Sequence, residues 1–441
     1  MKNRIYFLAA ALFLMCSFGT FTSCKDETPT PDESLNPGSS DKDDDDEEEP
    51  TNPDKPFDYS GFYSEKSETN KLVMTYGGEP ISGKVVEVAF KAPSSEEQKA
   101  TATLKLKGTD LDINSLLGEL TTIDPLKTPG PIPGEPEFTL SDIQLTKETD
   151  GYSFDSEDFN SALGRTVKYS GKFTEGNLNM NLNVSYSADN DLMANLWSPL
   201  QLSNKDDVTL RVYWTSTEKF QGLSGLVGFL LTFDKLPYLL INDAGLVNGM
   251  GVNEVLKNSV QYISFTNDGC IIPHCSTSGD LNNPVWGEDA NRNLMHYYMD
   301  AENNRRTYLE IDANYLLGSL SGLFMAASRA ADPSDLSGNI KNLIEILRPH
   351  LYNGIPFNFG DNGASWIYVE PSLVLEIVHA VAPILENPTV QELLKGLLKE
   401  KISGIGYDVS EEDVNKIVEQ LPGCLAACTS ANLDFCFKKY N

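Results

Sequence analysis

The sequence has 441 residues, enough for two or three domains with cores of their own. Its 64 acidic residues outnumber 34 lysines and arginines, which gives a formal net charge of −30 at pH 7. A surface of that charge repels nucleic acid and anionic lipid, so neither is expected to be a partner of the folded part.

Residues 1–23 have the pattern of a secretory signal peptide, because a positive start precedes an uncharged, mostly apolar run from Ile5 to Phe18. This run is too short for a comfortable membrane span. Residues 21–24, Phe-Thr-Ser-Cys, resemble a lipobox, which implies cleavage before Cys24 and acylation of its thiol. An ordinary cleaved signal peptide with an incidental cysteine is the alternative.

Residues 24–56 are predicted to form an acidic, disordered tether. Eight acids and one lysine stand between Asp41 and Glu49, and such a segment cannot bury enough apolar surface to offset the entropy lost on ordering. The residues directly after Cys24, Lys-Asp-Glu, resemble the signal that sends lipoproteins of Bacteroidota to the outer face of the outer membrane. We therefore expect acylated Cys24 to anchor the protein in the lipid bilayer of the outer membrane, facing the cell exterior.

Residues 57–203 are predicted to form a first β-barrel-like domain. Apolar and polar residues alternate there at period two, and one face of each strand is therefore expected to be wet. The predicted strands are residues 72–76, 84–90, 100–106, 138–146, 152–155, 166–174 and 177–186. Short antiparallel strands joined by short loops are typical of a barrel or a sandwich.

Residues 204–441 are predicted to form a second β-barrel-like domain that repeats the first. Residues 110–120 and 310–320 share six of eleven residues, and two further matches follow in the same order. The spacing between matches grows toward the C-terminus, which places an insertion before the last strand. We therefore expect an internal duplication, with extra residues in the second copy.

The inserted residues, about 371–421, have helical patterns. Pro371 and Pro388 suit first-turn positions, and Ser410 followed by acidic residues resembles a capping box. Apolar residues recur at three- and four-residue spacing, as in an amphipathic helix: Leu373, Val374, Ile377, Val378 and Val381. This stripe is expected to pack on the barrel, and partner binding is the alternative. Residues 220–231 and 335–347 are predicted to add further helices.

Five cysteines beyond Cys24 are disulfide candidates in an exported protein, and the odd count leaves at least one thiol over. They are Cys270, Cys275, Cys424, Cys428 and Cys436. Buried thiols are the alternative. His274 lies between the first two, but no second matched pair of ligands accompanies them, so no metal site is predicted.

We expect neither an enzyme nor a cofactor, because the sequence contains no GxSxG, HExxH, Walker or GxGxxG motif. Its four histidines stand alone. The favoured function is a ligand-binding module for a glycan or a small apolar molecule. The alternative is a structural protein, either an adhesin or an accessory subunit that binds an outer-membrane protein partner, with no small ligand.

Aromatic residues near predicted strand and loop ends are the candidate ligand-binding residues, because aromatic rings stack on sugars or line an apolar cup. They are Tyr213, Trp214, Trp286, Tyr297, Tyr298, Trp366 and Tyr368. For each of them, a place in the hydrophobic core is the alternative.

The lipobox, the acidic tether and the Tyr59-Ser60-Gly61 opening before a β meander together resemble surface lipoproteins of Bacteroidota with calycin-like, that is lipocalin-like, β-barrel domains. The resemblance covers chiefly residues 57–186. It implies a surface-displayed or periplasmic-facing β-barrel, and the helical insertion departs from that pattern. The fold class expected for the whole chain is mainly β with α insertions, with two tandem antiparallel barrels or sandwiches, the second carrying the helical insertion. The resemblance carries over no activity to particular residues.

Overall fold

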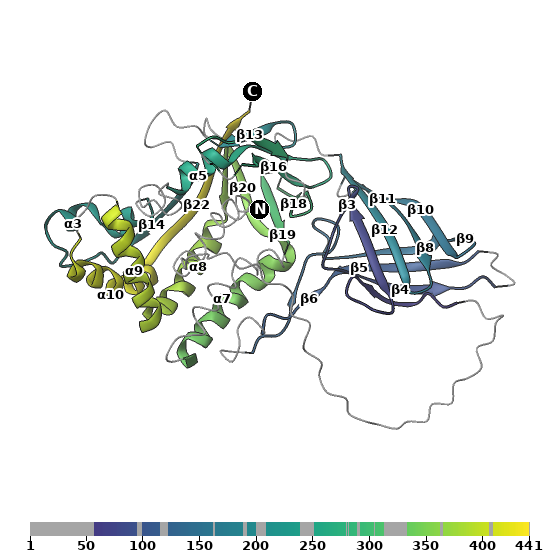
Figure 1. The fold of residues 1–441 in the computed structure, drawn as a ribbon, viewed down its shortest axis with the longest axis horizontal. Helices are drawn as coiled ribbons and strands as arrows, with labels where there is room; N and C mark the ends of the chain where they lie inside the picture. Colours follow the sequence, from purple (N-terminus) through teal and green to yellow (C-terminus); the bar gives the residue numbers. More distant parts are fainter. Residues whose placement is uncertain are drawn as a thin grey trace, which may run out of the picture.

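The computed structural model describes residues 57–94, 99–114, 122–161, 164–187, 192–199, 209–238, 251–278, 280, 282–288, 292–303, 305–312, 333–361, 365–404 and 409–440. Cys24, the predicted signal peptide over residues 1–23 and the predicted tether over residues 24–56 lie outside this described part. Within it, the chain is mainly β and is built around two large sheets, one of them nearly barrel-shaped (Figure 1).

The first sheet follows the alternating pattern of the sequence, and all seven predicted stretches form strands, although the stretch at residues 138–146 divides into two strands and the one at residues 152–155 extends to Asn160. Its strands are β1 (Gly61–Ser64), β2 (Lys71–Tyr76), β3 (Glu79–Pro80), β4 (Lys84–Lys91), β5 (Thr101–Gly108), β8 (Glu137–Gln144), β9 (Thr146–Glu148), β10 (Gly151–Asn160), β11 (Arg165–Thr174) and β12 (Asn177–Tyr186). Their order is β8-β5-β4-β1-β2-β12-β11-β10-β9, and β3 pairs with β2.

One part of the first sheet departs from the antiparallel prediction, because β2 runs parallel to both β1 and β12. The chain crosses the first sheet an odd number of times. Its first crossing, which includes β2, and its last crossing, β12, therefore run in the same direction where they pair. β8 also approaches β10 at the other side of the sheet, which brings the structure close to a closed barrel.

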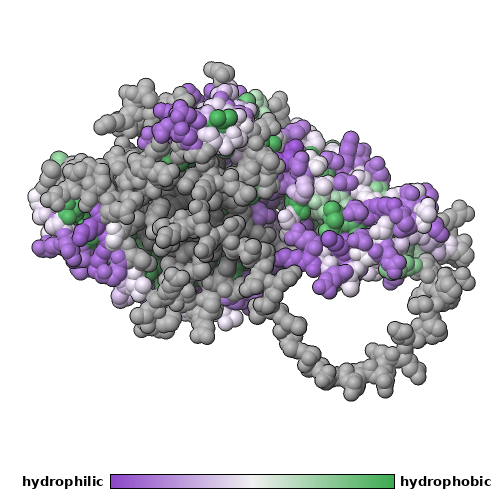
Figure 2. All heavy atoms as spheres, viewed as in Figure 1, coloured by the Kyte–Doolittle hydropathy of each residue, from purple (hydrophilic) through white to green (hydrophobic). Residues whose placement is uncertain are grey.

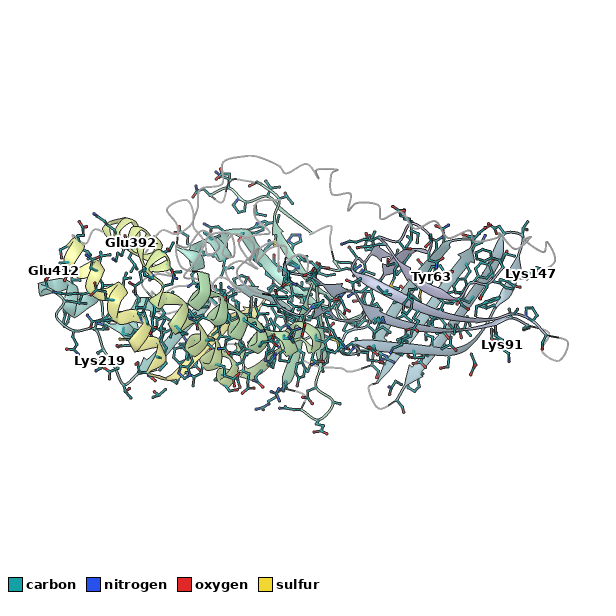
Figure 3. All side chains as sticks on the ribbon, turned by 90° about the horizontal axis from the view of Figure 1, so that it is seen from below. Tyr63, Lys91, Lys147, Lys219, Glu392 and Glu412 are labelled. Carbon is teal, nitrogen blue, oxygen red and sulfur yellow. The ribbon has the colours of Figure 1, made fainter. Side chains whose placement is uncertain are left out.

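The interior of the first sheet is a packed core. Every second residue of β12 is buried there, from Leu178 to Val184. Aromatic rings fill much of the space: Tyr63 lies 6.2 Å from Phe173 and Tyr59 lies 5.7 Å from Tyr152, between ring centroids. Such ring pairs contribute about 0.5–1.5 kcal/mol each beyond the area they bury. Tyr63, labelled among the strands of this sheet in Figure 3, is buried.

The second sheet consists of antiparallel pairs around the last strand of the chain. Its strands are β13 (Leu196–Pro199), β14 (Leu210–Ser216), β15 (Val260–Phe265), β16 (Ile271–Ser276), β17 (Trp286–Glu288), β18 (Met295–Met299), β19 (Arg306–Ile311), β20 (Ile355–Asp361), β21 (Ser365–Val369) and β22 (Cys428–Lys439). Their order is β17-β16-β15-β13-β22-β21-β20-β19-β18, and β14 also pairs with β22. A bridge between Cys270 and His296 brings the two sides of this curled sheet together.

The second sheet begins earlier than the domain boundary expected at residue 203. β13 already pairs with β15 and β22. Its residue Trp197 belongs to the second core, with 1% of its surface exposed. A small sheet of β6 (Asp110–Leu111) and β7 (Leu126–Lys127) also leads residues of the N-terminal half into the second core, among them Ile113 and Ile123.

The helices predicted between the last two strands are confirmed. They are α8 (Pro371–Val381), the 3₁₀ turn η3 (Ala382–Glu386), α9 (Pro388–Gly404) and α10 (Glu411–Ala426). The Oγ of Ser410 accepts a hydrogen bond from the N–H of Asp413 at 3.1 Å, as the capping pattern predicts. On α8 four residues of the apolar stripe are buried and Val378 is partly buried, and the helix packs on β22, so packing accounts for the stripe.

The other helices are α3 (Gly225–Leu230), η1 (Phe233–Lys235), α4 (Leu236–Tyr238), α5 (Val252–Ser259) and α7 (Pro333–Asn353). α3 and α7 confirm the further helices predicted near residues 220–231 and 335–347. Glu392 and Glu412, on α9 and α10, lie at the opposite end of the molecule from Lys91 and Lys147 of the first sheet (Figure 3). Among the described helices none alone has the length and apolar character to cross a membrane, although Pro371–Glu386 and Pro388–Gly396, bent by 94°, pass on those two criteria as a pair.

Candidate functional site

An apolar hollow, here called the inner cavity, lies on the inner face of the second sheet. Its volume is about 90 Å³. Strands β15, β16 and β18–β22 supply most of its wall, chiefly through alternate residues that point to this side, with Tyr308 and Asn358 as the exceptions. The lining residues are Leu192, Ile263, Phe265, Ile271, Met295, Tyr297, Thr307, Tyr308, Leu309, Ile311, Phe357, Asn358, Phe359, Ile367, Phe435 and Phe437.

Three polar side chains that line the inner cavity have hydrogen-bond partners outside its lining. Thr307 Oγ1 donates to the Met299 sulfur at 3.5 Å, and Asn358 Nδ2 donates to Glu370 Oε2 at 3.0 Å. The Tyr297 hydroxyl donates to the carbonyl of Thr266 at 2.7 Å. A molecule inside the inner cavity would therefore meet chiefly hydrocarbon and aromatic surface.

A second and larger hollow, here called the tyrosine cleft, lies between the two sheets and has a volume of about 310 Å³. Its lining residues are Pro133, Gly134, Tyr186, Met193, Tyr297, Tyr298, Met299, Asp300, Ala301 and Tyr308. The first three belong to the N-terminal half, so both halves of the chain build its wall. On the face seen in Figure 2, the described surface of the first sheet is mostly hydrophilic, with small apolar patches.

The tyrosine hydroxyls of the cleft are used to hold its wall. Tyr186 donates to the carbonyl of Pro133 at 2.9 Å, and Tyr298 donates to the carbonyl of Asn353 at 2.5 Å. The rings of Tyr298 and Tyr308 are stacked with their centroids 4.8 Å apart. The Tyr308 hydroxyl donates to Asp300 Oδ2 at 3.3 Å. The cleft therefore presents ring edges, methionine side chains and one carboxylate.

Below the cleft, a buried carboxyl joins the two halves of the molecule. Glu310, on the outer face of β19, is 4% exposed and accepts a hydrogen bond from the N–H of Gly134 at 2.9 Å. Burial raises the pKa of Glu310 to about 7, although the Gly134 N–H and the charge of Lys84 act in the other direction. Lys84 donates to the carbonyls of Pro129 and Gly130, and burial lowers its pKa.

Asn293 and His296 continue this polar junction. Asn293 Nδ2 donates to three carbonyls of the first sheet, those of Tyr76, Glu79 and Pro80, at 2.9 to 3.1 Å. His296 Nε2 lies 3.3 Å from Asn293 Oδ1, and its ring centroid lies 4.9 Å from that of Tyr76. Burial lowers the pKa of His296 to about 3, so this histidine is a neutral part of the packing.

The structure brings together two of the seven aromatic residues predicted to bind a ligand. Tyr297 and Tyr298 are neighbours on β18 and both line the tyrosine cleft. Trp214 is instead a core residue, because its ring stacks on Phe233 and its indole N–H donates to the Phe233 carbonyl at 2.8 Å. Tyr213, the next residue along β14, points the other way and is 38% exposed beside Arg211.

The remaining three predicted aromatics lie on other strands. Trp286 is a half-buried residue of the edge strand β17. Tyr368 lies on β21, but the residue of this strand that lines the inner cavity is its neighbour Ile367. Trp366 is also on β21, but its side chain lies outside the described part of the structure.

The site also contains Tyr186, Tyr308 and Glu310, which were not predicted from the sequence. Tyr308 stands in an alternating stretch opposite Tyr298, so a predicted hairpin register would have found it. Glu310 is an acid within an otherwise apolar strand end, which is a signal for a buried polar contact. No local pattern marks Tyr186, whose role depends on the packing of the two halves.

The five cysteines of the described part form no disulfide. Cys270, Cys424 and Cys428 are buried, which is the alternative left open by the sequence. Burial raises the pKa of each of these thiols, to about 12, 11 and 12 in that order. Among the described residues, no group of three or more His, Cys, Asp or Glu is arranged to hold a metal ion.

The fold and the site define a two-part, mainly β protein with an apolar cavity in one sheet and a tyrosine-lined cleft between the parts. No protein-family model, no curated protein and no solved structure matches this chain.

Proposed function

We propose that this protein binds a small, mainly apolar molecule in the inner cavity of the second sheet. The observation that carries the proposal is the composition of the wall: apolar residues from seven strands surround one hollow. Enclosed apolar hollows with a few polar groups at their rim are the usual form of small-molecule sites in proteins.

An apolar ligand fits this wall better than a glycan. A sugar that loses water must regain hydrogen bonds to its hydroxyl groups, at a cost of about 1–3 kcal/mol for each one left unpaired. The wall offers little for this purpose, since Thr307, Asn358 and Tyr297 already have partners. The first sheet, with its packed interior, acts in this proposal as a support for the second.

We also propose that acylated Cys24 and the acidic segment after it hold the protein on the outer membrane, facing the exterior. The signal-like start, the lipobox-like stretch at residues 21–24 and the acid-rich run from Asp41 to Glu49 support this location. Labelled palmitate is expected to enter the wild-type chain in its host, and Cys24→Ala is expected to remove the label. Equal labelling of both chains would contradict the anchor.

A calycin-like identity and an origin by duplication remain part of the same proposal. Both halves curl a large, mostly antiparallel sheet around an interior and end on a long strand, β12 or β22, which supports a common plan. The parallel pairing of β2 and the helices before β22 are the features in which the halves differ.

The binding proposal is tested with N-phenyl-1-naphthylamine, a neutral apolar dye that becomes fluorescent in dry sites. We expect the wild-type protein to bind it, and Leu309→Trp to weaken binding by about tenfold or more, because the larger ring fills the cavity. Leu196→Trp is the matched control, since Leu196 is 36% exposed on the same sheet. A folded Leu309→Trp protein that binds the dye normally would overturn the proposal. A wild-type protein that binds no dye would favour a structural role.

A further inference from the structure

The inner cavity and the tyrosine cleft are neighbours that share part of their walls. Tyr297 and Tyr308 line both hollows. The segment before β13 also serves both, because Leu192 borders the inner cavity and Met193 borders the cleft. The two hollows therefore lie next to each other and share Tyr297 and Tyr308 in their walls.

The two hollows differ in chemistry along this path. The inner part is apolar, whereas the cleft adds the carboxylate of Asp300 and the backbone of Pro133 and Gly134. Among the described residues that line the cleft, Asp300 is the only ionisable side chain other than tyrosine. Arg306, which lies over the Tyr308 ring with its guanidinium carbon 5.6 Å from the centroid, contacts Glu370 at 3.5 Å.

The combined size also fits a ligand longer than the inner cavity. The inner cavity alone, at about 90 Å³, is small, and the cleft at about 310 Å³ extends it to the range of typical small-molecule sites. A hydrocarbon tail fits the apolar inner cavity. A head group without negative charge fits the cleft, because the Asp300 carboxylate repels an anion and the whole protein has a net charge of −30.

We infer that the inner cavity and the tyrosine cleft form one site for an amphiphile, with its hydrocarbon tail inside the second sheet and a neutral or cationic head group between the two sheets. This inference rests on the proposed function and adds to it the class of ligand. It also gives the first half of the chain a part in binding, because Pro133, Gly134 and Tyr186 form the wall around the head group.

The test measures displacement of N-phenyl-1-naphthylamine by three probes with the same ten-carbon tail, each below its micelle concentration: decanol, decyltrimethylammonium and decanoate. We expect the first two to displace the dye at concentrations about tenfold lower than decanoate. Asp300→Asn is expected to reduce the preference for decyltrimethylammonium over decanoate by about fivefold, the effect of one nearby charge.

Glu302→Gln is the matched control, because it removes the same charge from an exposed position of the same loop without touching the cleft. Ala301→Trp places a ring in the cleft and is expected to weaken all three probes by about tenfold, while the dye itself still binds in the inner cavity. Preferences that are equal in the wild-type, Asp300→Asn and Glu302→Gln proteins would overturn the inference. If these preferences are equal but Leu309→Trp still weakens dye binding, the inference fails and the proposed function stands. If the wild-type protein does not bind the dye, the inference and the proposed function both fail.

Discussion

The carboxyl group of Glu310 accepts a hydrogen bond from the backbone N–H of Gly134 at 2.9 Å, which joins the second sheet to the loop before β8 of the first. Both residues also border a hollow: Gly134 lines the tyrosine cleft, and Glu310 lines a small polar hollow with Lys84 and His296. Because these ionisable groups are buried, the packing of the two halves is linked to the protons they hold.

Glu310 and His296 are expected to give stability opposite dependences on pH. Burial raises the pKa of Glu310 from 4.5 to about 7, so the folded protein keeps a proton that the unfolded chain loses, and stability falls as the pH rises through this window. Burial lowers the pKa of His296 from 6.5 to about 3, with Lys84 and Arg292 adding to the shift. The unfolded chain then holds the extra proton, so stability rises with pH across that window.

The two slopes oppose each other where the windows overlap, between pH 4.5 and 6.5. In this pH range the unfolding free energy of Glu310→Gln is expected to rise with pH, because only the His296 effect remains. That of His296→Gln is expected to fall with pH. Each slope is at most about 1.4 kcal/mol per pH unit. Urea unfolding followed by circular dichroism at several pH values measures both slopes. Parallel curves for the two variants would contradict the assignment.

Gly134→Ala is expected to destabilise the protein by about 1–3 kcal/mol. The φ angle of Gly134 is +78°, and an added Cβ would lie 2.8 Å from the ring of Tyr298, so the backbone is strained and the ring must move. Gly78→Ala is the matched control, because φ is +85° but no atom lies within 4 Å of the added Cβ. Thermal unfolding compares the two, and an equal loss in both would show that the ring contact has no effect.

Asp413→Asn is expected to cost about 1–3 kcal/mol, because a buried carboxylate loses charge-assisted hydrogen bonds. Its oxygens accept from the N–H and Oγ of Ser224 and from Ser410 Oγ at 2.5 to 2.8 Å. Although burial acts to raise it, the pKa of Asp413 is lowered by these bonds, so the stabilisation is lost as the pH falls below the ordinary range of an aspartate. Glu412→Gln, on the exposed side of the same turn, is the control in urea unfolding.

The buried thiols are expected to resist modification in the native protein. With Cys24 replaced by serine, dithionitrobenzoate at neutral pH should leave Cys270, Cys424 and Cys428 unmodified, since each is buried and its raised pKa keeps it protonated. Unfolding in guanidinium without reductant should release all five thiols of the described part. Fewer than five would show that a disulfide forms in solution.

Period-two alternation and helix capping were enough to predict most strands of the first sheet and the helices before β22, because both patterns are local, whereas most strands of the second sheet and helix α5 were not predicted. The alternation from Leu178 to Val184 predicts β12, and Ser410 with its acids predicts the start of α10. The parallel pairing of β2 with β12 was not predictable in this way, since it joins residues about a hundred positions apart.

The site was predictable only in part for the same reason. Tyr297 and Tyr298 stand out locally as adjacent aromatics on a strand, and they do line the cleft. Trp214 has the same appearance in the sequence but packs on Phe233, which follows it on a separate turn. The contact of Glu310 with Gly134 spans the two halves, so no short stretch of sequence contains the information for it.

The direction of β2 determines which end of the first sheet contacts the second half. The chain enters the described fold near Tyr59, whose ring packs on Phe90 and Tyr152, whereas the other end of β2, at Tyr76, contacts Asp268 and His296 of the second half. The entry point and the cavity-bearing half therefore lie at opposite ends of the first sheet. Any support that holds the chain ahead of Phe57 would therefore place the first sheet next to the support and the second half at the far end of that sheet.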